Sequence, residues 1–350
     1  MEPATVPHGQ DTTRRRFSVR AVGQVVAWIC WLLSLGPALV LAALRLADPA
    51  APRLIEAISF TPSGGIGAMV ALCLTPVVAR RRPLRAVLGA AAALVLALHT
   101  TWQAPLFLGS APALDPGCRI TVMSQNFEYG QVASLAEIVA AEQVDVLVVV
   151  VEARGATAAQ ARAELTPQLP HAAGVTAGRW NNAVVLSRFP VLASATSADA
   201  RSSWARVQTP CLGAVDVLAI HPTPPYAGTA WRRDFALIHD FVQDRVGAGL
   251  GDGTARVIAM GDLNATLDHA PLRHLLEVGL RDAAEAVNAG WMPTYPAPGS
   301  TRRWGLPVPP LVPIDRVLVG AGLAVGGIHT VQVTDSDHLG VVATVGAVAR

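Results

Sequence analysis

Lysine is absent from this 350-residue sequence, and charged residues of every kind are scarce. All 27 basic residues are arginine, which we attribute to codon bias rather than to chemistry. Only 15% of the residues are charged and 52% are hydrophobic, with a mean hydropathy of +0.41. These values exclude intrinsic disorder and a small disulfide-rich scaffold. They also argue against a purely soluble globule, and the length allows one large domain or two modest ones.

Surplus positive charge is missing from the C-terminal two thirds of the chain. Residues 1–109 carry ten arginines against four acids, whereas residues 110–350 carry seventeen arginines against twenty-one acids. The second part is therefore mildly acidic, and it offers no basic surplus that would attract a nucleic-acid backbone.

Three long apolar stretches lie in the first third of the chain, at residues 21–44, 54–79 and 86–109. At about 1.5 Å of helical rise per residue, each is long enough to cross a hydrocarbon core of about 30 Å. Three buried helices of a large soluble protein are the alternative, which the arginines clustered at the ends of the stretches disfavour. The sequence therefore predicts three transmembrane helices.

The placement of arginine predicts the orientation of these helices. Four arginines precede the first stretch and four more lie at residues 80–85, whereas the loop after the first stretch has two arginines opposed by one aspartate. By the positive-inside rule, residues 1–20 form a cytoplasmic tail, residues 21–109 a membrane anchor and residues 110–350 an extracytoplasmic domain of the cell membrane. A cleaved signal peptide is the alternative for the first stretch, but its length and the two following stretches favour a retained anchor.

Two of the four cysteines, Cys118 and Cys211, fall in the outer domain, where a disulfide could persist. If the strands that begin near them are parallel neighbours, both cysteines lie at one end, with Asn126 and His221 at the other. The offset of two residues corresponds to about 7 Å of strand rise. This is near the limit of disulfide reach, so a bond and two unpaired thiols both remain open.

The outer domain alternates short apolar strands with amphipathic helices, which predicts two packed sheets covered by helices. A capping box of Ser134 and Glu137 is predicted to open the first helix. Residues 293–313 are rich in proline and predict a long loop at the rim. Further helices are expected near 157–165, 231–246 and 271–278. Strands are expected at 119–124, 144–151, 183–186, 205–209, 215–220, 256–260, 317–319, 330–333 and 341–345.

Polar side chains adjoin six of these apolar segments. They are Asn126, Glu152, His221, Asp262 with Asn264, Asp315, and Asp337 with His338. A single carboxylate at a strand end is usually a turn residue or a helix cap. Six such ends together indicate a ligand site, because loops at strand ends are free of the packing constraint of the core.

The residue types in this set favour a hard divalent cation. Glu152, Asp337 and Asn126 offer oxygen ligands, which suit Mg²⁺ or Mn²⁺. Zinc is less suited, because the set has no cysteine and only two histidines. A carboxylate-bound cation beside two imidazoles fits phosphoester hydrolysis, in which the cation neutralises phosphate oxygens.

The other residues of the set have roles in the same chemistry. His338 beside Asp315 could be an oriented acid–base pair. Asp262 could orient the nucleophile, while Asn264 and His221 could donate hydrogen bonds to phosphate oxygens.

The segments that carry these residues resemble the ordered signature of the endonuclease/exonuclease/phosphatase superfamily. The resemblance covers residues 119–345 and implies a four-layer α/β sandwich, made of two packed mixed β-sheets flanked by helices, with magnesium-dependent phosphoester hydrolysis. The matching segments are residues 123–126 (MSQN), 149–152 (VVVE), 185–188 (VLSR), 261–264 (GDLN), 314–317 (IDRV) and 336–338 (SDH).

The resemblance also implies roles for individual residues. Glu152 would be the principal metal ligand, with Asn126 and Asp337 near it. The catalytic histidine would be His338, paired with Asp315 of the IDRV segment. Asp262 and Asn264 of the GDLN segment would position water and phosphate, and His221 would be the second phosphate-binding residue. One departure is Val151, which stands where the superfamily usually has a glutamine that supports the metal ligand.

The substrate is not fixed by the fold. The three-span anchor, with the HP of residues 221–222 and the TYP of residues 294–296, is similar to bacterial membrane proteins associated with vancomycin or teicoplanin resistance. That similarity implies a phosphorylated cell-wall lipid, such as a polyprenyl diphosphate, and the aromatic and basic residues of the 291–313 loop could hold its headgroup. An extracytoplasmic nuclease, a sphingomyelinase-like phosphodiesterase and a non-catalytic receptor are the alternatives.

Overall fold

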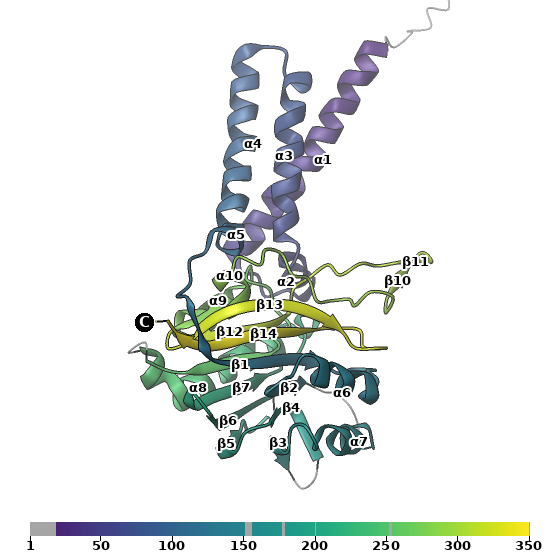
Figure 1. Ribbon diagram of the computed structural model, residues 1–350. Coiled ribbons are helices and arrows are strands. Elements are labelled where there is room, and N and C mark those ends of the chain that lie inside the picture. Colours follow the sequence, from purple (N-terminus) through teal and green to yellow (C-terminus); the bar gives the residue numbers. More distant parts are fainter. Residues whose placement is uncertain (1–18, 151–155, 177–178, 200, 252–253, 350) are drawn as a thin grey trace, which may run out of the picture.

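The computed structural model describes residues 19–349 except 151–155, 177–178, 200 and 252–253. Three long helices rise from one side of an α/β body that runs from β1 to β14 (Figure 1). Most of the predicted cytoplasmic tail, residues 1–18, lies outside the described residues.

The three long helices are α1 (Val19–Ala47), α3 (Thr61–Val78) and α4 (Arg82–Gln103). Each is long and apolar enough to cross a membrane, with mean hydropathies of 2.2, 1.5 and 1.6. Small residues let α1 and α3 approach closely: a Cβ at Gly67 would lie 2.5 Å from the carbonyl oxygen of Ser34. The expectation of three apolar helices is therefore confirmed.

The start of the second predicted span is wrong. Residues 54–58 do not continue α3 but belong to α2 (Pro52–Ile58), a separate short helix that lies against the α/β body (Figure 1). Pro62 lies in the first turn of α3, where a residue without an N–H begins a helix without loss of a hydrogen bond. The third stretch likewise ends early, because α5 (Pro105–Leu108) is separate from α4.

The α/β body contains two six-stranded sheets. The first sheet consists, in spatial order, of β13 (Ala324–Gln332), β14 (Leu339–Val348), β1 (Leu114–Asn126), β2 (Val146–Val150), β4 (Arg179–Ser187) and β3 (His171–Thr176). The second consists of β5 (Val191–Thr196), β6 (Ser202–Thr209), β7 (Gly213–Ile220), β8 (Val257–Asp262), β12 (Asp315–Gly320) and β9 (Leu280–Asp282). Both sheets are mixed, since β1 is parallel to β2 and β7 is parallel to β8, while the other pairs are antiparallel.

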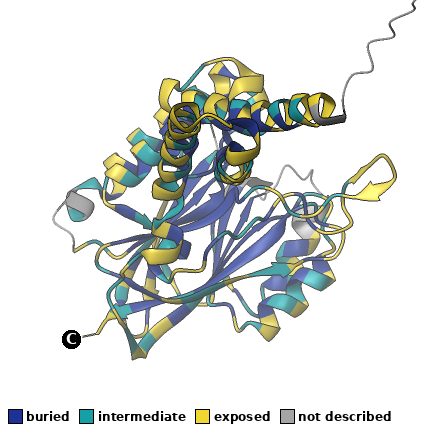
Figure 2. Cartoon of the chain, turned by 90° about the horizontal axis from the view of Figure 1, so that it is seen from above, coloured by how far each residue is buried: buried dark blue, intermediate teal, exposed yellow. Residues whose placement is uncertain are grey.

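Helices cover the outer face of each sheet, which completes four layers. α6 (Val132–Ala141) and α7 (Ala156–Leu165) pack on the first sheet, and α8 (Thr229–Gly251) and α9 (Ala270–Glu277) pack on the second. Three apolar cores result, one between the sheets and one beneath each helical layer. The sheets lie at the buried centre of the body (Figure 2). The predicted four-layer α/β sandwich is thereby confirmed.

Three smaller elements lie at the edge of the body. They are a 3₁₀ turn η1 (Pro225–Ala227), a short helix α10 (Ala283–Ala286) and the hairpin of β10 (Arg302–Arg303) and β11 (Leu306–Pro307). The hairpin interrupts the predicted 293–313 loop and projects from the body on the side of the helices (Figure 1). The apolar pattern did not predict β3, β5 or β9, which are edge strands and pair on only one side.

The predicted capping box is wrong. Gln131 is the N-cap of α6 and makes no side-chain cap. The hydroxyl of Ser134 instead accepts a hydrogen bond from the backbone N–H of Thr334, 3.0 Å away and 200 residues further along the chain. A tertiary contact therefore uses the side chain that the local pattern assigned to the helix end.

Cys118 and Cys211 form a disulfide, with their Cα atoms 5.4 Å apart. The bond joins β1 of the first sheet to the β6–β7 turn of the second, so the expectation that the two strands are neighbours in one sheet is wrong. Their predicted common direction is right, because Asn126 and His221 both lie near Asp262. The remaining cysteines are free and lie in α1 and α3.

Candidate active site

Strand ends from both sheets meet at Asp262, the last residue of β8. The amide nitrogen of Asn126, at the end of β1, donates to Oδ2 of Asp262 over 3.0 Å. Nε2 of His338 lies 3.8 Å from the same oxygen and Nε2 of His221 lies 4.0 Å from it. Four of the predicted site residues, which span more than 200 positions of sequence, are thus brought together and are all buried.

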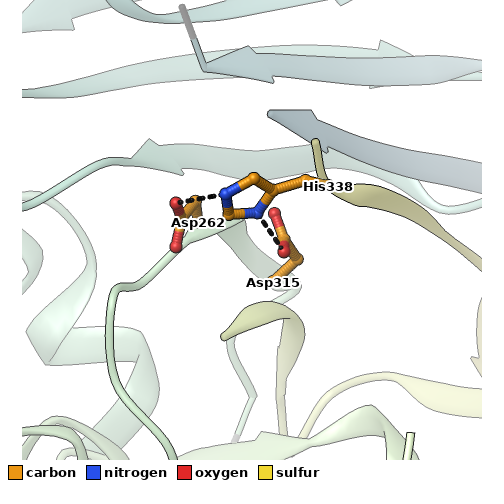
Figure 3. A group of neighbouring side chains, drawn as sticks. All are labelled: Asp262, Asp315 and His338. Carbon is orange, nitrogen blue, oxygen red and sulfur yellow. Dashed lines mark hydrogen bonds and ion pairs between the residues drawn. The ribbon is translucent and has the colours of Figure 1, made fainter. Parts of the chain in front are cut away.

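His338 is also bound to Asp315, which begins β12 directly opposite Asp262 in the sheet register (Figure 3). Nδ1 of His338 lies 2.8 Å from Oδ2 of Asp315. The hydroxyl of Thr294 accepts the backbone N–H of Asp315 at 3.1 Å and thereby fixes the start of the strand. Atoms of Asp262, Asp315 and His338 that could bind a metal lie within 4.8 Å of one another.

The charges around His338 favour its protonated form. Burial disfavours the imidazolium, but the nearby carboxylates of Asp315, Asp262 and Asp337 outweigh burial and raise the pKa of His338 to about 10. Burial by itself raises the pKa of Asp315 as well. We place the shared proton on His338, because three carboxylates face its ring.

Two side chains to which the sequence assigned no role, Gln125 and Ser336, connect the end of β1 to the segment just before β14. The amide nitrogen of Gln125 donates to Oγ of Ser336 at 3.1 Å and to the carbonyl oxygen of His338 at 3.4 Å. Oγ of Ser336 donates to the carbonyl oxygen of Asn126 at 2.9 Å. These buried bonds fix the positions of two site residues. The sequence signal that could have indicated Gln125 and Ser336 was their place inside the MSQN and SDH segments.

Asn264 positions the loop that carries His221. Its backbone N–H donates to Oδ1 of Asp262 at 2.8 Å, and its side-chain amide donates to the carbonyl oxygen of Pro222 at 3.0 Å. Its φ of +46° is in the left-handed region, which asparagine tolerates better than most residues. The side chain therefore connects the two loops that follow β7 and β8.

Of the predicted metal ligands, Glu152 lies outside the described residues. In sequence, Glu152 comes two positions after Val150, the last residue of β2. Val150 pairs in register with Asn126. Asp337 is half-buried beside the site, and burial raises the pKa of its carboxyl. Its Oδ1 is buried with no hydrogen-bond partner among the described residues.

A pocket of about 360 Å³ is lined by six of the predicted site residues, namely Asn126, His221, Asp262, Asn264, Asp337 and His338. Glu128, Tyr226 and Tyr295 extend its wall, and the ring of Tyr295 lies 4.7 Å from that of His338. The described lining residues are rich in carboxylates and contain no arginine. An unbalanced set of carboxylate and amide oxygens, one of them buried without a partner, fits a hard divalent cation.

A family model described as the endonuclease/exonuclease/phosphatase family matches residues 123–338, and the chain belongs to this family. The superfamily resemblance seen in the sequence is thereby confirmed. The matched region begins in β1 and ends at His338, so it contains the strand ends that meet at Asp262. Members of the family hydrolyse phosphoesters and typically depend on a divalent metal.

Three solved structures are similar to this chain. An endonuclease/exonuclease/phosphatase from Beutenbergia cavernae is 21% identical over 66% of this chain and 72% of its own, with a TM-score of 0.49. A mannosyl-6-phosphatase from Bacteroides thetaiotaomicron is 15% identical over 65% and 99%, with a TM-score of 0.49. Sphingomyelinase C from Streptomyces griseocarneus is 18% identical over 65% and 99%, with a TM-score of 0.43. A search of the curated proteins gave no match.

Proposed function

We propose that the protein is a membrane-anchored, extracytoplasmic, divalent-metal-dependent hydrolase of a phosphorylated lipid, such as a polyprenyl diphosphate cell-wall carrier. One observation carries this proposal: Asn126, His221, Asp262 and His338 converge in one pocket of a body attached to three apolar helices. Such a set provides acid, base and phosphate-binding groups together. The resemblance to resistance-associated bacterial membrane proteins favours a cell-wall lipid.

The ligands that we assign to Mg²⁺ or Mn²⁺ are Glu152, Asn126 and Asp337. When bound, the cation neutralises phosphate oxygens and lowers the pKa of a coordinated water. The cluster of Asp262, Asp315 and His338 is the other candidate for the cation. We assign it to proton transfer instead, because the 2.8 Å bond between His338 and Asp315 already occupies a ligand atom of each.

The remaining residues act on the water and the phosphate. Asp262 orients the attacking water and accepts its proton, since its Oδ2 is the point that the other site residues surround. His338, held as the imidazolium by Asp315, stabilises charge on the phosphate and donates a proton. His221 donates to a phosphate oxygen, and Asn264 assists by fixing the loop of His221.

The extracytoplasmic orientation is supported by two features. Arg80 and Arg81 lie between α3 and α4, and Arg82 and Arg85 lie in the first turn of α4, at the ends of these helices far from the α/β body (Figure 1). By the positive-inside rule that end faces the cytoplasm. The disulfide of Cys118 and Cys211 fits an oxidising compartment. A C-terminal reporter active only outside the cytoplasm tests this orientation, and a silent reporter in a stably expressed fusion would reverse it.

A nuclease is the second candidate, because the family includes nucleases by its name. It is disfavoured by the carboxylate-rich pocket, since a nucleic-acid track needs basic side chains to bind the backbone. A sphingomyelinase-like phosphodiesterase shares the lipid surface and differs in the bond that is cleaved.

The deciding experiment offers the purified full chain three substrates with Mg²⁺: a polyprenyl diphosphate, duplex DNA and a phosphodiester lipid. We expect release of inorganic phosphate from the first, and loss of that release with EDTA. Glu152→Gln and His338→Ala should each reduce turnover by about a hundredfold or more. His329→Ala, at an exposed position of β13, is the matched control. Shortened DNA, or full activity in both site variants, would overturn the proposal.

A further inference from the structure

The segment between α1 and α3 is part of the active-site pocket and not only a tether. Three of its residues, Glu56, Ser59 and Phe60, line the same pocket as Asp262 and His338. Phe60 directly precedes α3, the second apolar helix. The pocket therefore extends from the strand ends to the point where this helix leaves the α/β body.

The α/β body holds this segment through its apolar core. Ile55 of α2 is fully buried and packs in the core beneath α8 and α9. The ring of Trp231 lies in the same core, and its indole N–H donates to the carbonyl oxygen of Asn264 at 3.0 Å. The core that contains Ile55 is therefore also connected, through Trp231, to the loop that carries Asn264.

A buried histidine adds a polar connection. Burial lowers the pKa of His269, which keeps its ring neutral. Nδ1 accepts the backbone N–H of Thr266 at 3.0 Å, so the proton lies on Nε2. Nε2–H then donates to the carbonyl oxygen of Ile55, 2.9 Å away. The backbone of α2 is thus fixed relative to the loop that follows β8.

Ion pairs connect the end of α1 to the same body. The guanidinium of Arg232 donates to both carboxylate oxygens of Asp48 at 2.7 and 2.9 Å. Arg45 lies 2.7 Å from Asp268. Such multiple connections hold the position of Phe60 relative to His338, which a flexible linker would not do.

Beside the polar Glu56 and Ser59, this part of the pocket wall has two exposed aromatic side chains. The side chain of Phe60 is 46% exposed, and Tyr226 on η1, which lines the same pocket, is 68% exposed. α2 packs directly against η1, since a Cβ at Gly228 would lie 3.1 Å from the ring of Pro52. Exposed aromatic side chains at the mouth of a pocket are suited to bind apolar groups of a ligand.

We infer that Phe60 and Tyr226 form a subsite for the hydrocarbon chain of a lipid substrate, next to the phosphate subsite at His221 and His338. This inference rests on the proposed function and names the residues that recognise its substrate. The chain would pass Phe60 toward the apolar helix that begins at the next residue. The anchor is then a specificity element, and the enzyme selects amphiphiles from the membrane in which it is embedded.

The test compares two substrates that share a diphosphate group and differ in chain length. Full-length wild type, Phe60→Ala and Tyr226→Ala are assayed in detergent with a five-carbon and a fifteen-carbon prenyl diphosphate. The ratio of kcat/KM for the long chain to that for the short chain should fall about tenfold in each variant. This is the loss expected when about two methylene groups lose an apolar contact.

Phe107→Ala is the matched control, because Phe107 of α5 is 56% exposed and does not line this pocket. Its ratio should stay within about twofold of the wild-type ratio. A ratio unchanged in both Phe60→Ala and Tyr226→Ala, in protein with a wild-type melting temperature, would overturn the inference and leave the proposed function standing. If the wild type hydrolyses neither prenyl diphosphate, the inference and the proposed function are both overturned. If Phe60→Ala does not fold, Tyr226→Ala decides the question.

Discussion

Nδ1 of His338 lies 2.8 Å from Oδ2 of Asp315, although the two residues are 23 positions apart and the whole of β13 lies between them in sequence. The pair is buried, and the other ring nitrogen of His338 faces Asp262. The carboxylate of Asp315 thus orients the ring through Nδ1, while the carboxylate of Asp262 lies near Nε2. Both carboxylates favour the protonated form of His338.

The pH profile should depend on Asp315. Because the pKa of His338 is raised to about 10, its imidazolium persists through neutral pH and is lost as pH rises toward that value. Asp315→Asn removes the carboxylate closest to the ring, so the proton should be lost at lower pH. We expect the alkaline decline of kcat to move to lower pH, with about a tenfold or greater loss of activity at pH 9. Asp335→Asn, an exposed carboxylate nearby, is the control, and superimposable profiles would contradict the assignment.

The disulfide should contribute strongly to stability. Cys118 and Cys211 are separated by 93 residues, and a cross-link that closes a loop of this length destabilises the unfolded chain by about 4.6 kcal/mol through lost conformational entropy. Replacing both cysteines with serine should lower the melting temperature of the α/β body by about 10 °C. The same replacements at Cys30 and Cys73, which are free, serve as the control. A melting temperature that changes equally in the two double variants would show that the cross-link adds no stability.

Arg232 should protect the anchor segment from proteolysis. Its guanidinium also donates to the carbonyl oxygens of Asp48 and Pro49, at 2.9 and 2.7 Å, just before α2. Loss of these charge-assisted hydrogen bonds in Arg232→Ala should ease local opening by about 1.4 kcal/mol or more. We expect trypsin to cleave after the exposed Arg53 at least about tenfold faster.

Arg233→Ala is the matched control for this experiment, because it removes an exposed arginine at the next position. Cleavage is followed by mass spectrometry of the fragments. Equal cleavage rates in the two variants would mean that the ion pair does not hold the segment.

Glu285 should make stability depend on pH in the opposite sense from an ordinary surface carboxylate. Burial, and next the charge of Asp282, raise the pKa of Glu285 to about 7. A carboxyl whose folded pKa lies above its unfolded value favours folding in its protonated form, so this stabilisation is lost as pH rises from about 4.5 to 7.

The variant Glu285→Gln tests this effect, because the amide cannot ionise. It should melt at about the wild-type temperature at pH 4.5 and roughly 2–4 °C higher at pH 8, a modest shift because the side chain is partly exposed to solvent. Glu137→Gln, on the exposed face of α6, should give no pH-dependent difference. A lower melting temperature for Glu285→Gln at pH 8 would show that the ionised carboxylate is stabilising.

Much of the candidate site followed from local sequence. Valine-rich β2 and apolar β8 are recognisable by composition, and the polar residues directly after such strands mark one end of the sheets. The order of the MSQN, GDLN and SDH segments is by itself sufficient to indicate the family. The structure then placed Asp262 at the point where these segments meet.

Other features depended on contacts that no local pattern encodes. Ser134 has the spacing of a helix cap but binds Thr334 instead. Ile55 has the hydropathy of a membrane residue, yet it is buried in the core beneath α8. In both cases the residue type fits two environments equally well, and a partner distant in sequence decides between them.

The sequence by itself determined the apolar helices, the alternation of strands and helices, and the identity of the polar residues at strand ends, because each depends on neighbours within a few positions. Only the tertiary structure decided that Cys118 bonds to Cys211, that Thr294 fixes Asp315, and that Phe60 of the anchor lines the pocket. These relationships join segments from different sheets or from the anchor and the body. They depend on how the layers pack, which is set by the burial of the whole apolar surface and not by any single segment.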